Sequence, residues 1–251
     1  MRIRPKKAVS TNKHMSSYRF QFRPALTFVV AIAFALLITL GSWQMHRLEW
    51  KQGLIAQVEA RVNGEPIPFV DAVRRAGAGE NMEYTPVTIA GRLQAEKEAR
   101  VFGTLDGAPG AYVFAPVETA AGVVYVNRGF APQDALSVPC FCDAAATEDA
   151  FTGLFRAAEQ PSPPASWFQT TGKSVDGLWF VRDPQAFAAD AGLSAPPYYI
   201  DQYVVAGRDW PQGGTTRLDF NNRHLEYALT WFGLAATLVG VWIAFSLKKP
   251  D

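Results

Sequence analysis

The stretch NRHLEYALTWFGLA, residues 222–235, sets a histidine between two charged residues and directly against an apolar run. Arg223 and Glu226 flank His224, and residues 227–247 contain no Asp, Glu, Lys, Arg or His. A helix of these 21 residues is about 31 Å long at ~1.5 Å per residue, which matches a hydrocarbon core of roughly 30 Å. The sequence therefore predicts a membrane span with a histidine at its edge, and a buried core helix is the alternative.

A second apolar segment lies near the other end of the chain. Residues 24–46 contain no Asp, Glu, Lys or Arg, and seven positive charges with no acid precede them in residues 1–23. The alternative is a cleaved signal peptide, but the apolar stretch exceeds the usual core of about 7–15 residues and Trp43-Gln44 stands where small residues are expected. The segment is therefore predicted to be an uncleaved anchor.

The charges at the two ends of the chain predict the orientation of the spans. Positive residues remain on the cytoplasmic side of a membrane, or the matrix side in an organelle, so the leader 1–23 and the tail 248–251 are expected there. The helices 24–46 and 224–247 then form a hairpin. Residues 47–223 lie on the opposite face, which is the periplasm of a bacterium or the intermembrane space of a mitochondrion. The predicted location is the inner membrane.

The exported part carries the signals of a β-rich domain. Runs rich in Val, Tyr and Phe predict two paired strands at 83–93 and 99–105, and a hairpin at 111–119 and 122–130. Further strands are expected at 149–159, 177–183 and 198–207, a short helix at 184–193, and loops at 161–164 and 210–216. The first helix should continue beyond Trp43 to about residue 62. The fold class is thus a two-span α-helical membrane hairpin enclosing a β-rich (α+β) exported domain.

Small residues in both spans predict that the two helices touch, since helix association in lipid depends on close packing. The residues expected to allow this approach are Ala31, Ala33, Ala35 and Gly41 in the first span, and Gly233, Ala235, Ala236 and Gly240 in the second.

Charge and histidine content exclude several classes of protein. Residues 47–223 carry 15 Lys or Arg against 21 Asp or Glu, and this acidic balance argues against a nucleic-acid partner. The three histidines are His14 in the leader and His46 and His224 at the membrane edges. The exported domain therefore has no interior histidine for a Ser-His-Asp triad or a His-ligated zinc site. We expect a protein that is not an enzyme.

The two cysteines lie close together, as Cys140 and Cys142 in PCFCD. Outside the cytoplasm a C-x-C pair can form a local disulfide, remain as two thiols or bind copper(I). Copper carriers usually have additional Met or His residues nearby, and this stretch has none. The pattern alone leaves these alternatives open.

Helical spacing brings His224 together with aromatic residues of the second span. On a helix, His224, Tyr227, Ala228 and Trp231 share one face. Such a face offers an imidazole for iron, aromatic rings for a flat macrocycle and a small residue for clearance, which is the pattern of a haem site. The alternative is an interfacial histidine within an ordinary aromatic belt.

The outer end of the first span has a related pattern, since Trp43, His46, Arg47 and Trp50 share one helix face. In an antiparallel hairpin His46 and His224 lie at similar depth, so two imidazoles could ligate one iron, or Arg47 could pair with a haem propionate. The alternative for Arg47 is an interfacial charge that extends toward water. The haem-binding candidates are thus His224 as axial ligand, with Tyr227, Trp231, Trp43, Arg47 and, more weakly, His46.

Four motifs resemble the surfeit locus protein 1 family, the Shy-type assembly factors of cytochrome c oxidase. GSWQMHRLEWK (41–51) is similar to the family's G-x-W-Q-x-x-R-x-x-W-K, and EYTPVTIAGRL (83–93) to its Tyr-x-Pro-Val strand. VNRGFAP (126–132) resembles its Asn-Arg-Gly turn, and NRHLEYALTWFGLA resembles the signature that opens its second span. The motifs occur in the family's order around two spans, and the match covers most of the chain.

The resemblance implies a non-catalytic role, in which the protein helps haem a to reach the catalytic subunit of a haem-copper oxidase. It implies that His224 is the haem a ligand, and it leaves haem a synthase as a further candidate partner. His46 stands at an open position of the first motif, and Cys140 and Cys142 match no motif of the family. The alternative function is a membrane scaffold that stabilises an oxidase assembly intermediate without carrying haem.

Overall fold

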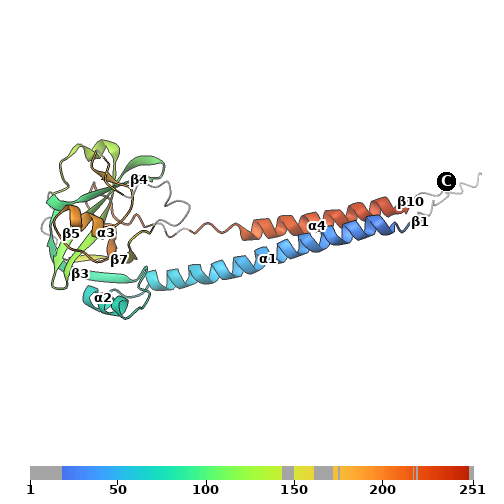
Figure 1. Cartoon of the computed structure of the whole chain (residues 1–251), viewed down its shortest axis with the longest axis horizontal. Helices are drawn as coiled ribbons and strands as arrows, with labels where there is room; N and C mark the ends of the chain where they lie inside the picture. Colours follow the sequence, from blue (N-terminus) through green and yellow to red (C-terminus); the bar gives the residue numbers. More distant parts are fainter. Residues whose placement is uncertain are drawn as a thin grey trace, which may run out of the picture. The chain divides into compact units, whose positions relative to one another are not determined.

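The computed structural model describes residues 19–142, 150–160, 172–174, 176–216, 218 and 220–248. The chain divides into two compact units, Met1–Leu54 with Asn221–Asp251 and Ile55–Phe220. The first unit is helical and the second is β-rich (Figure 1). Helix α1 (Pro24–Val62) begins in the first unit, and its residues from Ile55 onward belong to the second.

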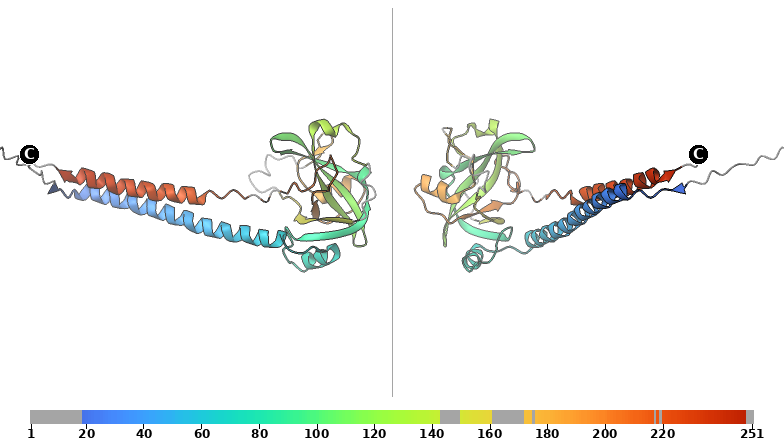
Figure 2. Two further views of the ribbon diagram at one scale, coloured as in Figure 1. Left: turned by 180° about the vertical axis from the view of Figure 1, so that it is seen from behind. Right: turned by 45° about the vertical axis from the view of Figure 1, so that its right-hand side comes forward.

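The first unit consists of two long helices and a short pair of strands. Helix α1 lies alongside α4 (His224–Ser246), as both views in Figure 2 show. Both helices are long and apolar enough to cross a membrane, with mean hydropathies of 2.4 and 1.8 in their most apolar windows. Only 6% and 11% of these windows are buried in the protein, which speaks against buried core helices. The predicted continuation of the first helix to residue 62 is confirmed.

The predicted contact between the two helices is present. A Cβ atom on Gly41 would come within 2.5 Å of the Phe232 ring, so the absence of a side chain there lets α4 approach. Nearer the start of α1, Trp242 Nε1 donates to Thr27 Oγ1 at 3.2 Å. Gly233 and Gly240 were also predicted to allow close approach of the helices, and this prediction is wrong. An added Cβ would meet no heavy atom within 4 Å at either position. These two glycines lie on faces of α4 that point away from α1.

The strands of the second unit close into a barrel. Strand β3 (Pro86–Leu93) pairs with β7 (Ala150–Ala157), β7 with β9 (Tyr198–Gln202), and β9 with β6 (Gly122–Pro132). Strand β6 pairs with β5 (Ala108–Thr119), and the end of β5 pairs back to β3. Only the β6–β9 pairing within this ring is parallel.

Shorter elements extend and cover the ring. They are β4 (Ala99–Leu105) beside β5, β8 (Leu178–Trp179) beside β4, β2 (Ile67–Pro68) beside β3, helices α2 (Phe69–Gly77) and α3 (Pro184–Asp190), and 3-10 turns Ala95–Lys97 and Gln133–Ser137.

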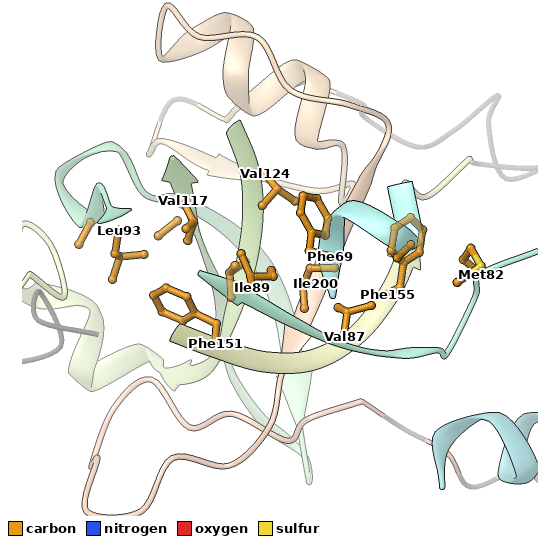
Figure 3. Close-up of a cluster of buried hydrophobic side chains, with 14 residues drawn as sticks. Phe69, Met82, Val87, Ile89, Leu93, Val117, Val124, Phe151, Phe155 and Ile200 are labelled. Carbon is orange, nitrogen blue, oxygen red and sulfur yellow. The ribbon is translucent and has the colours of Figure 1, made fainter. Parts of the chain in front are cut away.

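Alternate residues of the strands point into the barrel and form one apolar core, and α2 contributes to it. Figure 3 shows this cluster, which includes Phe69, Val87, Ile89, Val117, Val124, Phe151, Phe155 and Ile200. A second cluster lies on the outer side of β5 and β6, where Phe187 of α3 contacts Phe114, Tyr125 and Trp179 with ring centroids 5.1–5.6 Å apart. Because both sides are covered, β5 has eight consecutive buried residues rather than an alternating pattern.

The predicted elements are largely confirmed, but one predicted pairing is wrong. The hairpin of β5 and β6, strand β7 and helix α3 lie where expected. Strands β3 and β4 do not pair with each other, because β5 is long enough to pair with β4 through Ala108–Phe114 and with β3 through Val117–Thr119. Strands β8 and β9 are shorter than predicted. The predicted loop at 161–164 lies outside the described residues.

The resemblance suggested that the Asn-Arg-Gly motif forms a turn. In the structure the motif lies within strand β6 instead. The register between β5 and β6 shifts at this point, so that Val113 pairs with Gly129 and Phe114 with Asn127, and Arg128 is the extra residue of a β-bulge. Gly129 has φ +123°, which side chains disfavour, and a Cβ there would collide with the carbonyl of Gln212. The bulge therefore requires glycine.

Candidate functional site

His224 is the first residue of α4, and it lies partly buried on the face that packs against α1. Ala228 and Ala235 continue this face with exposures of 0% and 1%, and Trp231 between them is partly buried. Tyr227 is 51% exposed and lies at the margin of the face. The structure thus places His224, Ala228 and Trp231 on one line, with the tyrosine ring open to its surroundings.

A hydrogen bond fixes the ring of His224. Its Nδ1 atom lies 2.7 Å from Oε1 of Gln44 on α1. An amide oxygen only accepts, so Nδ1 carries the proton and the lone pair on Nε2 is left for another ligand. Histidines that bind metals commonly use their second nitrogen in this way, and the partner holds the ring orientation.

Gln44 is the residue of this site that the sequence did not single out. Gln44 lies three residues after Gly41 and four before Leu48, so the three residues share one helix face, and Gly41 and Leu48 are the two buried residues of α1. This helical spacing is the pattern in the sequence that indicates Gln44. A polar residue at helical spacing between two contact residues faces the partner helix. Near it, Lys51 Nζ donates to the backbone carbonyl of Asn221, which ties the start of α4 to α1.

The face of α1 predicted to carry Trp43, His46, Arg47 and Trp50 is exposed in the structure. The Arg47 guanidinium lies 3.9 Å from the centroid of the Trp50 ring, and Trp43 is 56% exposed. His46 is exposed, and its Nδ1 lies 2.8 Å from the Ser42 carbonyl of its own helix. Among the described residues, no contact joins His46 to His224. Ligation of one iron by both histidines therefore stays a prediction.

These residues fit a haem held by one protein nitrogen. His224 offers Nε2 with the opposite nitrogen already bonded, which is the donor chemistry of an axial ligand. Trp43 and Tyr227 present exposed rings, and Arg47 presents a cation of the kind that pairs with a propionate. When bound, a haem would bring the redox-active iron, which the protein's own side chains do not supply.

The second unit contains a buried polar centre where the barrel strands meet the loop after β9. Asp201 of β9 is 4% exposed, and three donors reach its carboxylate. Asn127 Nδ2 donates to Oδ1 at 2.7 Å, while Arg156 Nη1 and Thr216 Oγ1 donate to Oδ2 at 2.9 and 2.7 Å. A cavity of about 180 Å³ adjoins this centre, lined by Tyr112, Asn127, Arg156, Arg182, Asp201, Thr215 and Thr216.

The charges of this centre are paired within the protein. Burial alone lowers the pKa of Arg156, but Tyr199, Asp201 and Glu83 outweigh it and raise the pKa above its usual value. Glu83 accepts from Arg156 Nε at 2.7 Å and from the Ala157 amide at 2.8 Å. The Asp201 oxygens and the Glu83 oxygens already accept hydrogen bonds, so the centre fastens β6, β7 and β9 together and leaves little capacity for a ligand.

The structure joins Cys140 and Cys142 in a disulfide, the first of the three alternatives left open by the sequence. Phe141 between them is 7% exposed, and its backbone is held from two sides. Its amide donates to Glu98 Oε2 at 3.0 Å, and its carbonyl accepts from Arg128 Nη1 at 2.7 Å. The β-bulge thus directs Arg128 to this segment, which explains the arginine of the Asn-Arg-Gly motif structurally.

The fold defines a class of helical-hairpin proteins, in which a closed β-barrel domain lies between two long apolar helices in the sequence. In this chain a histidine at the start of the second helix is hydrogen-bonded to the first helix. A family model described as the SURF1 family matches residues 31–236. The chain is 32% identical to surfeit locus protein 1 of Rattus norvegicus over 89% of this chain and 75% of that protein. It is 31% identical to the Homo sapiens protein of that name over 98% and 85%, and 26% identical to a SURF1-like protein of Rickettsia felis over 86% and 95%. The chain belongs to the SURF1 family.

Proposed function

We propose that the protein is a membrane-anchored, non-catalytic assembly factor for a haem-copper cytochrome c oxidase. In this role it binds haem a through His224 and assists delivery of the haem to the catalytic subunit, with haem a synthase as the candidate donor. The observation that carries the proposal is the 2.7 Å bond between His224 Nδ1 and Gln44, which orients the ring and leaves Nε2 for iron.

Other features support the same function. Membership of the SURF1 family covers residues 31–236, which include both helices and the barrel. The barrel domain has no interior histidine in its sequence, and its buried carboxylate Asp201 is used by three internal donors. These features favour a carrier or adaptor over an enzyme.

The protein resides in the inner membrane with both termini on the cytoplasmic or matrix side and residues 47–223 exported. The uneven charge supports this orientation, because residues 1–23 carry seven positive charges and no acid. Reporter fusions after residue 20 and after residue 249 should report the cytoplasm, and a fusion at residue 150 should report export. A cytoplasmic signal at residue 150 would overturn the hairpin topology.

Haem binding is tested by an absorption spectrum of the full chain purified after co-expression with haem a synthesis. The wild type should carry haem a, and His224→Ala should be inserted and stable but lose most of the haem absorption. Oxidase activity should fall with it, because haem delivery becomes limiting while subunit synthesis continues. If His224→Ala retained full haem content, or supported normal oxidase assembly, the scaffold function would replace the carrier.

A further inference from the structure

The Cys140–Cys142 disulfide closes a loop that contains only Phe141. The stabilisation that a disulfide gives to a fold grows with the length of the closed loop, so this bond contributes little by that route. Both cysteines also lie in one segment that follows the turn Gln133–Ser137, so the bond joins no two strands of the barrel. A structural role therefore explains this disulfide poorly.

Phe141 is held in place by contacts that do not involve sulfur. Its side chain packs with Val113 and Ala131 in a small buried cluster. Its amide and its carbonyl are hydrogen-bonded to Glu98 and Arg128, as described above. These contacts remain when the disulfide is reduced, because none of them depends on the sulfur atoms.

The chain just before the cysteines is fixed in the same way by Arg100 of β4. Its Nη1 donates to the Leu136 carbonyl at 2.9 Å, and its Nη2 donates to the Val138 carbonyl at 2.8 Å. Its Nε donates to Glu98 Oε1 at 2.8 Å, so one carboxylate links Arg100 to the Phe141 amide. Reduction therefore leaves two thiols side by side, and the disulfide can form again without first ordering the chain.

The surroundings of the disulfide favour attack by a thiol on another polypeptide. Cys140 and Cys142 are each partly exposed, and the apolar residues Val138 and Pro139 just before them are exposed as well. These apolar residues offer a contact for the residues that flank an incoming cysteine. The Arg128 guanidinium contacts the carbonyl between the two cysteines, and positive charge at such a place favours the thiolate that leaves when a disulfide opens.

We propose that the Cys140–Cys142 disulfide is a thiol–disulfide exchange site that oxidises a closely spaced pair of thiols on an exported protein. This inference rests on the export of residues 47–223 proposed above, and the exchange is stoichiometric. One partner thiolate attacks a sulfur of the disulfide, the S–S bond breaks, and the released sulfur leaves as a thiolate that takes up a proton. The second partner thiolate then attacks the mixed disulfide, so that the partner gains a disulfide and both cysteines become thiols. Another exported protein that carries a disulfide restores the site by the reverse exchange.

The test is disulfide transfer from the purified full chain in detergent to a reduced peptide of sequence Cys-Ala-Ala-Cys, followed by thiol alkylation and mass spectrometry. The wild type should oxidise the peptide while Cys140 and Cys142 both become open to alkylation. The variant with Cys140→Ser and Cys142→Ser should lose this transfer completely. The peptide Cys-Ala-Ala-Ser is the matched control, and it should be oxidised at least about tenfold more slowly because its second thiol must come from a separate molecule.

Transfer from the wild type that is no faster than transfer from oxidised glutathione at the same concentration would overturn the site. The near-ultraviolet circular dichroism should be the same before and after reduction, and loss of the folded signal would instead identify the bond as structural. The haem spectrum separates this inference from the proposed function, since the double serine variant should retain full haem content and His224→Ala should retain disulfide transfer. A cytoplasmic reporter signal at residue 150 would contradict the export itself.

Discussion

His224 and Gln44 are 180 residues apart in sequence, and a 2.7 Å hydrogen bond from Nδ1 to Oε1 joins them across the two helices. The bond does two things at once. It ties the start of α4 to α1, and it fixes which nitrogen of the imidazole is available for a ligand. A site that depends on this bond should respond to changes on α1 that never touch the ligand.

The first prediction is that Gln44→Leu weakens haem binding by about 10- to 100-fold, as is common when the partner of a metal-binding histidine is removed. The ring then loses its fixed orientation and the proton on Nδ1 loses its acceptor. Haem retention and the position of the absorption maximum in the purified protein measure the effect.

His46→Ala is the matched control for Gln44→Leu, because His46 is exposed and its Nδ1 atom lies 2.8 Å from the Ser42 carbonyl of its own helix. It should leave the spectrum unchanged. A change from low-spin to high-spin iron in this variant would instead assign His46 as a second ligand. Trp231→Ala should weaken retention less than Gln44→Leu, since contact with one ring contributes on the order of 1 kcal/mol.

The second prediction concerns the contact between the two helices. Gly41→Val should destabilise the hairpin by about 1–3 kcal/mol, because the added atoms meet the Phe232 ring and force it to move. Thermal unfolding of the full chain in detergent measures the loss. Gly240→Val introduces the same side chain in the partner helix where nothing lies within 4 Å, and it should cost much less. Equal losses in the two variants would mean that only glycine's helix propensity is being measured.

The helices and the central hairpin were predictable because their signals are local. Hydropathy alone indicates α1 and α4, and the apolar runs on either side of residues 120–121 indicate the β5–β6 hairpin. Proline at the first position of α3 and Asp183 as its N-cap mark that helix equally well.

The closure of the barrel was not predictable in the same way, because it depends on partners far apart in the chain. The parallel pairing of β6 with β9 has no turn to mark it, and the pairing of β5 with two strands depends on its length. In the candidate site, the position of His224 followed from the sequence. Its bond to Gln44 did not, because the rotation of α1 about its axis decides which polar residue faces α4.

The third prediction addresses the buried polar centre of the barrel. Asp201→Ala should lower the free energy of unfolding by about 3 kcal/mol, because it leaves Arg156, Asn127 and Thr216 without their shared acceptor. Denaturant unfolding monitored by near-ultraviolet circular dichroism measures the loss. Glu118→Gln breaks the exposed pair with Arg92 and should give no measurable change. A small loss in Asp201→Ala would show that water replaces the carboxylate in the adjoining cavity.

The last prediction concerns Tyr125, a fully buried residue of β6 whose hydroxyl meets no hydrogen-bonding partner among the described residues. Burial raises the pKa of Tyr125 to about 12, from a usual value of 10.0. Between these values the unfolded chain loses the phenol proton and the folded protein keeps it, so stability falls as pH rises through this window. Tyr125→Phe should remove that part of the alkaline loss.

At neutral pH the same substitution should not destabilise the protein, and it should stabilise it by up to about 1 kcal/mol, because an unpaired buried hydroxyl costs desolvation free energy. Tyr199→Phe is the control. The Tyr199 phenol is also buried but has Arg182 as a hydrogen-bonding neighbour, so its removal should cost about 1 kcal/mol. Burial raises the pKa of both phenols, so unfolding at pH 7 separates the two tyrosines, and the comparison with pH 11 measures the alkaline loss that each of them contributes. A loss in Tyr125→Phe as large as that in Tyr199→Phe would mean that the Tyr125 hydroxyl has a stabilising partner in solution.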